Sequence, residues 1–167
     1  MTTLALEIHS KGLMQALRQY PELLKHHMEL AVLRSVQEIA RDARRNAPKA
    51  SSTLTRSITK RSIYWLNGAI VGEVVAGMEY ARMVEEGTGP GGWPSDRAML
   101  DWIHAKHIEP HDATMDEWDL AFLLARSIAL HGTPAQPYLK PALQNNKAKA
   151  ERRISRAINA ALKEMGR

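Results

Sequence analysis

The chain has 167 residues, a net charge of +5 and no cysteine. Its length suits one domain, over residues 1–167, that can bury its own core. The lack of cysteine excludes disulfides, thiolate nucleophiles and thiolate metal sites. The first residues have neither the basic start nor the apolar run of a signal peptide, and no stretch reaches the roughly 18 apolar residues of a membrane span. We therefore expect a soluble protein.

The first third of the chain predicts a long helix. Alternating residues indicate an edge strand at 4–9, and residues 13–20 a short helix. Pro21 suits the first turn of the next helix, which we expect to end before Pro48. Apolar residues recur there every three or four positions, which is typical of one buried helical face. The members of this face are Leu24, Met28, Val32, Val36, Ile39, Ala40 and Ala43.

A strand pair is expected next, after a polar linker at 49–53. Residues 54–65 resemble an imperfect strand with a basic face. The Asn67-Gly68 pair is typical of a two-residue hairpin turn, and the β-branched residues of 69–76 supply the second strand. A small antiparallel sheet with this central hairpin, packed against the long helix and joined by further helices, gives the α+β class.

Residues 77–94 predict a short helix followed by a glycine-rich loop. We expect Tyr80 to be buried under the sheet and Gly87 to end the helix with a positive φ. The loop runs into Trp93-Pro94-Ser95 rather than Gly-Lys-Ser/Thr, so a nucleotide-binding P-loop is rejected.

Residues 94–132 are expected to be a helical insert. Ser95 and Asp96 indicate the start of its first helix, whose apolar side has Met99, Leu100, Trp102 and Ile103. Thr114, with Glu117 three residues later, predicts a capping box for its second helix. The stripe expected to be buried on that helix is Trp118, Phe122, Ala125, Ile128 and Ala129. An apolar connector at 135–143 then leads to a basic C-terminal helix over 144–167.

The sequence contains no convincing catalytic constellation. His104, His107 and His111 lack the His-Glu-x-x-His pattern, so we interpret them as surface residues near a helix end rather than metal ligands. Ser57, Asp101 and His104 could suggest a hydrolase, but no Gly-x-Ser-x-Gly elbow activates a serine. We therefore expect no enzymatic activity.

Charge is unevenly distributed along the chain. Residues 41–61 and 140–167 are basic, and residues 79–119 between them are acidic. Opposite charges on separate segments allow two copies to pair head to tail, although solvated faces are the alternative. The basic residues expected to face a neighbour or DNA are Arg41, Arg44, Arg45, Arg56, Lys60, Arg61, Arg152 and Arg153.

Four motifs in order carry a resemblance to a known family. They are Asn46-Ala47-Pro48, Leu54–Ile58, Tyr80-Ala81 with Glu85-x-Gly87-Thr88, and Pro137–Leu143. Across residues 24–143 the chain resembles the tail-component or tail-completion family of long-tailed bacteriophages. Thr53 stands where that family commonly has a glycine before the leucine of the second motif.

The resemblance implies a structural virion protein without cofactors, assembled in the host cytoplasm. It implies a ring, expected to be a hexamer, at the head–tail junction, which joins a head-closure or connector protein to a tail terminator or tail tube protein. Residues expected at subunit or partner interfaces are Glu85, Glu86, Gly87, Thr88, Trp93, Pro137, Tyr138 and Leu139. Genomic DNA could touch a basic lumen without being read in sequence, and no membrane partner is expected.

The alternative function is a nucleic-acid-binding module that does not read sequence and uses the basic segments 41–61 and 140–167. Proteins that bind single strands interleave aromatic with basic residues. Here only Tyr64 and Trp65 border the first segment, so this alternative ranks second.

Overall fold

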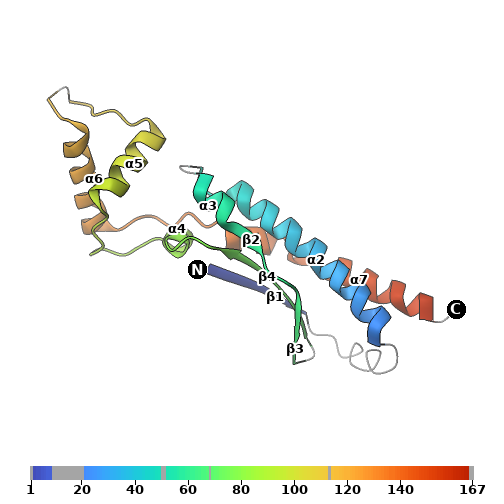
Figure 1. Cartoon of the computed structure of the whole chain (residues 1–167). Helices are drawn as coiled ribbons and strands as arrows, with labels where there is room; N and C mark the ends of the chain where they lie inside the picture. Colours follow the sequence, from blue (N-terminus) through green and yellow to red (C-terminus); the bar gives the residue numbers. More distant parts are fainter. Residues whose placement is uncertain (1, 9–20, 50–51, 68, 113, 166–167) are drawn as a thin grey trace.

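The structure is a computed structural model that describes residues 2–8, 21–49, 52–67, 69–112 and 114–165. These residues form an elongated body of sheet and helices, with a separate pair of helices at one end (Figure 1). The α+β class is confirmed. The expected strand at 4–9 is β1 (Thr2–Ile8), whereas the short helix expected at 13–20 lies outside the described residues.

The long helix is α2 (Pro21–Asn46), and it ends two residues before Pro48 as predicted. Its 26 residues span about 39 Å at the usual rise of an α-helix. All seven residues of the predicted apolar face are buried. The periodicity therefore identified both the helix and the side that it packs on the rest of the protein.

Strand β4 (Ala69–Ala76) is the centre of an antiparallel sheet. Strand β1 pairs with one edge of β4, and β2 (Ile58–Lys60) and β3 (Tyr64–Leu66) share the other. Leu66 is paired with Ala69, and Asn67 has a φ of 49°, so the two-residue hairpin is confirmed. The second strand of the predicted hairpin, β4, is therefore the central strand of the sheet, and its first strand, β3, lies at an edge.

Residues 52–57 differ from the prediction, because they form the short helix α3 (Ser52–Ser57) instead of a strand. Leu54 is buried in the core, and the Ser57 hydroxyl donates a hydrogen bond to the Leu54 carbonyl at 2.7 Å. Thr53 is part of this helix and not of a linker. Over so few residues local propensity is weak, and the burial of one side chain decides the conformation.

The last helix, α7 (Leu139–Met165), begins inside the segment expected to be a connector. Pro141 lies in its first turn, where a missing N–H removes no helical hydrogen bond. The boundary expected at residue 144 is therefore wrong. From the sequence Pro141 was expected to lie outside the helix, but a proline in the first turn is compatible with a helix.

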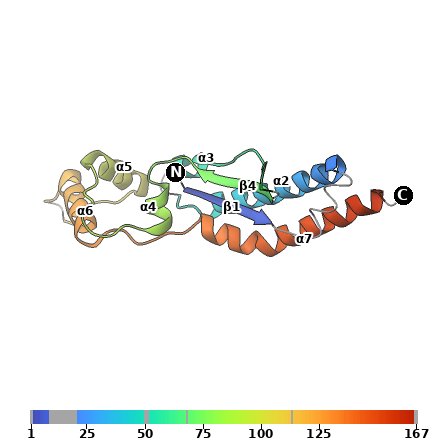
Figure 2. The ribbon, with the colours of Figure 1, turned by 90° about the horizontal axis from the view of Figure 1, so that it is seen from below.

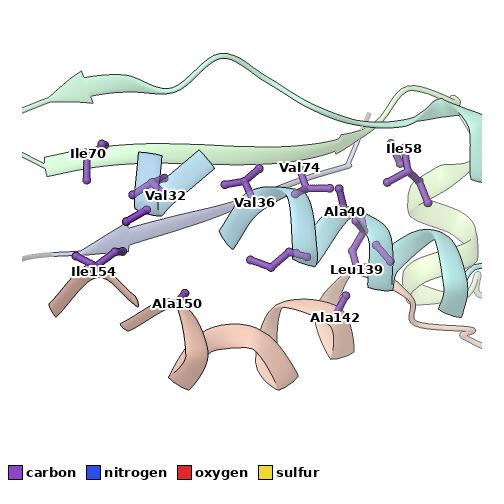
Figure 3. Packing of buried hydrophobic residues seen from close by; sticks show 14 of the residues in the cluster. Val32, Val36, Ala40, Ile58, Ile70, Val74, Leu139, Ala142, Ala150 and Ile154 are labelled. Carbon is purple, nitrogen blue, oxygen red and sulfur yellow. The ribbon is translucent and has the colours of Figure 1, made fainter. Parts of the chain in front are cut away.

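Helices α2 and α7 run antiparallel and cover the same face of the sheet (Figure 2). Arg153 of α7 donates to Glu38 at 2.8 Å and to Ser35 at 3.0 Å, and Asn146 donates to Asp42 at 2.7 Å. Below these polar contacts the two helices and the sheet enclose the core, which Figure 3 shows between Val36, Val74, Ala142 and neighbouring residues. Helix α7 is thus as much a part of the core as α2.

Three further helices extend from the end of the sheet. They are α4 (Ala81–Glu86), α5 (Asp96–Lys106) and α6 (Glu117–His131). Helices α5 and α6 lie beside each other and point away from the body in both views (Figures 1 and 2). We call residues 93–132 the arm. Tyr80 precedes α4 and packs against the core, but it is only partly buried, so the burial expected for it is incomplete.

Two predicted helix starts have different outcomes in the arm. Ser95 caps α5 by accepting a hydrogen bond from the Ala98 N–H at 3.3 Å, as expected. Helix α6 is capped by Asp116, which forms a capping box with Asp119, and not by Thr114. The Asp112 carboxylate accepts hydrogen bonds from both the hydroxyl and the N–H of Thr114, so that hydroxyl is already engaged before the helix begins.

Candidate assembly site

Glu85 lies at the end of α4 and is buried. Its carboxylate accepts hydrogen bonds from the backbone N–H groups of Tyr138, Leu139 and Lys140, at 2.8, 2.9 and 2.8 Å. These groups form the N-terminus of α7, where backbone N–H groups have no partner within the helix and favour a negative charge. Glu85 therefore caps α7 from a distant part of the chain.

This arrangement corrects three of the expected interface residues. Glu85, Tyr138 and Leu139 are buried against one another and do not lie on a surface. Burying a carboxylate is unfavourable, but three charge-assisted hydrogen bonds offset that cost. Burial also raises the pKa of Tyr138 to about 12, with smaller contributions from the negative charge of Glu85 and from Tyr80.

The chain leaves the body at Thr88 and returns at Thr133, and these two residues form an antiparallel bridge. The Thr88 N–H donates to the Thr133 carbonyl at 3.0 Å, and the reverse bond is 3.2 Å. Their hydroxyl oxygens are 3.0 Å apart. The Gln136 N–H also donates to the Val84 carbonyl at 2.8 Å. Backbone hydrogen bonds thus join the two chain segments that lead into and out of the arm, next to the end of α4.

Glycines flank this bridge for a steric reason. Gly87 has a φ of 74°, which confirms the predicted positive value, and Gly132 has a φ of 75°. The ψ of Gly87 is −179°, a combination that only glycine adopts easily. A Cβ atom at Gly87 would also lie 2.7 Å from the Thr133 carbonyl oxygen. Both the conformation and the space therefore require glycine.

We expect Gly87→Val to destabilise the protein by about 3 kcal/mol, because backbone strain adds to a backbone clash that cannot relax by rotating a side chain. Urea unfolding followed by circular dichroism measures this difference. The matched control is Gly89→Val, since a Cβ atom at Gly89 meets nothing within 4 Å. Equal stability of the two variants would contradict the steric account.

The arm exposes two aromatic side chains that were predicted from the sequence to be buried. Helices α5 and α6 lie beside each other, and their buried residues are Ile103 on α5 and Ala121 and Ala125 on α6. Trp118 is 61% exposed and Phe122 is 52% exposed, so their predicted burial is wrong. Helix α6 is apolar around most of its circumference, and small side chains allow the closer approach to α5.

Trp93 is exposed, as expected for an interface residue, and its ring contacts that of Phe122 with 5.6 Å between centroids. Pro137 and Glu86 are exposed as well. Glu86 forms an ion pair with Arg82 at 2.8 Å, one turn earlier on α4. Thr88 is half-buried in the bridge described above. Some of the expected interface residues are thus buried or half-buried within the fold, whereas Glu86, Trp93 and Pro137 are exposed.

Three of the eight basic residues make contacts within the fold. Arg44 donates to the Ile58 carbonyl at 2.6 Å, Arg61 lies 3.5 Å from Glu73, and Arg153 holds α7 against α2. Arg41 and Arg45 are exposed near Asp42, at 3.9 and 3.8 Å. The remaining members of the set are all exposed: Arg56, Lys60 and Arg152.

A shallow polar hollow lies between α5 and α6, where His104 Nε2 is 2.9 Å from Glu117 Oε2. His107 and Glu109 also line it. Within the described ranges no three histidine or carboxylate side chains come together as a set that could hold a metal ion. None of the described helices has the length and apolarity needed to cross a membrane.

Comparison with known proteins gives one match. Residues 11–87 match a family model described as "Bacteriophage HK97-gp10, putative tail-component". No curated protein and no solved structure matches the chain. The matched segment covers slightly less than half of the chain, and it ends at Gly87, immediately before the bridge to the arm. The resemblance of residues 88–143 is thus not covered by this match.

The matched segment includes α2, α3, α4 and the strands β2, β3 and β4, but not β1 or α7. Components of phage tails are structural proteins of the virion, so the match supports a structural phage tail protein. Over residues 11–87 the chain is therefore similar to the HK97-gp10-like family of phage tail components, the kind of family that its motifs predict.

Proposed function

We propose that this protein acts at the head–tail junction of a long-tailed phage, as a ring of identical copies that completes the tail. The observation that carries the proposal is the match of residues 11–87 to a phage tail component. In this proposal the ring is a hexamer between a head-closure or connector protein and a tail terminator or tail tube protein. The exposed apolar side chains of the arm support it, because such surface is typical of protein interfaces.

The test uses a phage that carries a stop codon in the gene and a host that supplies the protein from a plasmid. We expect infection without the plasmid to give full heads and separate tails, and infection with it to restore complete particles. The protein should be present in purified complete particles at a constant ratio to the tail tube protein. Complete particles formed in its absence would refute the proposed role.

Nucleic-acid binding is the second candidate, because the chain outside the arm has twenty basic and eleven acidic residues. A basic lumen would contact phosphates without reading sequence. Its affinity for DNA should then fall steeply with salt and should not depend on sequence. The exposed residues to test are Arg56 and Lys60, because Arg44 and Arg153 are engaged within the fold.

A further inference from the structure

The arm holds a large share of the apolar surface of this protein. Half of the large apolar side chains that are exposed in the described parts of the chain lie between residues 93 and 130. Trp118 and Phe122 are one turn apart on α6, and Trp93 lies against Phe122. Contiguous exposed aromatic side chains of this kind mark a surface that another protein covers.

The arm also differs in charge from the rest of the chain. Residues 93–132 contain seven acidic and three basic side chains, against eleven and twenty elsewhere. Two arms placed together would therefore bring like charges close to each other, which is unfavourable. A basic partner surface fits the arm better than a second arm does.

Such a surface exists on α7. Lys149, Arg152, Arg156 and Lys163 follow one another at helical spacing, so they form one stripe, and all four are exposed. None of the four forms an ion pair with another described residue. Arginine side chains pack on aromatic rings and pair with carboxylates at the same time, which matches the two kinds of side chain on the arm.

The stripe cannot be covered by the arm of the same copy. The arm points away from one end of the body, and the stripe lies toward the other end of α7 (Figures 1 and 2). A contact between them must therefore join two copies. It would use a different surface on each copy, so it leaves one arm and one stripe free to continue the assembly.

We propose that the arm of one copy docks on the basic stripe of α7 in a second copy. Trp118 and Phe122 lie against Arg152 and Arg156, and the carboxylates of the arm lie beside the same cations. This inference rests on the proposed function, because it names the contact through which copies of the protein form a ring. Repetition of one such contact closes a ring when a whole number of the rotations between neighbouring copies adds up to a full turn.

The test uses two variants with complementary defects, and sedimentation velocity measures the size of each. The arm variant is Trp118→Ser/Phe122→Ser, and the stripe variant is Arg152→Glu/Arg156→Glu. We expect the wild-type protein to associate and each variant alone to be a monomer. A mixture of the two should form a dimer and no larger species, because only one arm and one stripe remain intact between them.

Two control variants remove similar side chains elsewhere. Met83→Ser/Leu66→Ser changes exposed apolar residues, and Arg34→Glu/Arg56→Glu changes exposed basic residues, outside both surfaces. Both should associate like the wild type, and circular dichroism should show that all four variants are folded. A monomeric wild-type protein, a stripe variant that still associates, or a mixture without dimers would each overturn the proposal.

Failure of this contact and failure of the proposed function give different results. If the arm variant still completes phage particles although its copies no longer associate, docking of the arm on the stripe is not the contact that forms the ring. If particles form without the protein at all, the role at the head–tail junction is wrong, whatever the copies do in solution. The sedimentation and infection experiments therefore answer separate questions.

Discussion

Val36→Asp is expected to unfold the protein. Val36 is 1% exposed, and it packs so closely on the sheet that a Cβ atom added at Gly72 would lie 2.5 Å from its Cγ2 atom. An aspartate there would be a buried carboxylate without a partner, which costs at least about 3–5 kcal/mol. That loss is comparable to the whole stability of many domains.

Thermal unfolding by circular dichroism measures the effect. Gln37→Asp is the matched control, because Gln37 is the next residue of α2 and is exposed. The control should melt close to the wild-type temperature, since exposed substitutions usually change stability by less than about 0.5 kcal/mol. A wild-type melting temperature for Val36→Asp would show that this face of α2 is not in the core.

Glu85→Lys should have the second large effect. The substitution leaves three N–H groups at the start of α7 without an acceptor and places a positive charge beside them. We expect a loss of about 3–5 kcal/mol, as for removal of one partner from a buried charged cluster. Glu85→Gln keeps an oxygen acceptor and should lose less.

Glu86→Lys is the control, because Glu86 is adjacent, is exposed and pairs with a surface arginine, Arg82. Urea unfolding compares the variants, and amide hydrogen exchange at Tyr138, Leu139 and Lys140 locates the change. Equal stabilities of Glu85→Lys and Glu86→Lys would show that the cap contributes nothing.

The sequence predicts the body well where the signal is local. The apolar side chains of α2 recur on one side only, so a single face can be buried, and Pro48 marks its end. Asn67-Gly68 likewise determines the hairpin turn through its own backbone preference. These features depend on neighbours a few residues away, which is the range over which sequence patterns carry information.

The arm was harder to predict because α6 offers too many apolar side chains. Leu120, Leu123 and Leu124 accompany Trp118 and Phe122, so periodicity does not select one face. The face that is buried is the one with the small residues Ala121 and Ala125, and Ile103 is the buried residue of the neighbouring helix α5. The packing of α5 on α6, and not the periodicity of α6 alone, therefore determines which aromatic side chains are exposed.

The buried role of Glu85 had no local signal either. Its partners are 53 to 55 residues later in the chain, and a glutamate on a six-residue helix looks like an ordinary surface residue. The same is true of Arg153, whose partners on α2 are more than a hundred residues away. Two of the motifs that carry the resemblance, at Glu85–Thr88 and Pro137–Leu143, are joined by the hydrogen bonds of Glu85.

The antiparallel packing of α2 and α7 has a consequence for the order of folding. Ser35 and Arg153 are 118 residues apart, so α2 leaves the ribosome long before the helix that covers it has been synthesised. Until then the growing chain exposes apolar residues of α2 that bind chaperones or become targets of proteases. Such long-range contacts also slow folding, because a large loop must close first. A prematurely terminated chain without α7 would therefore be degraded before it could enter a particle.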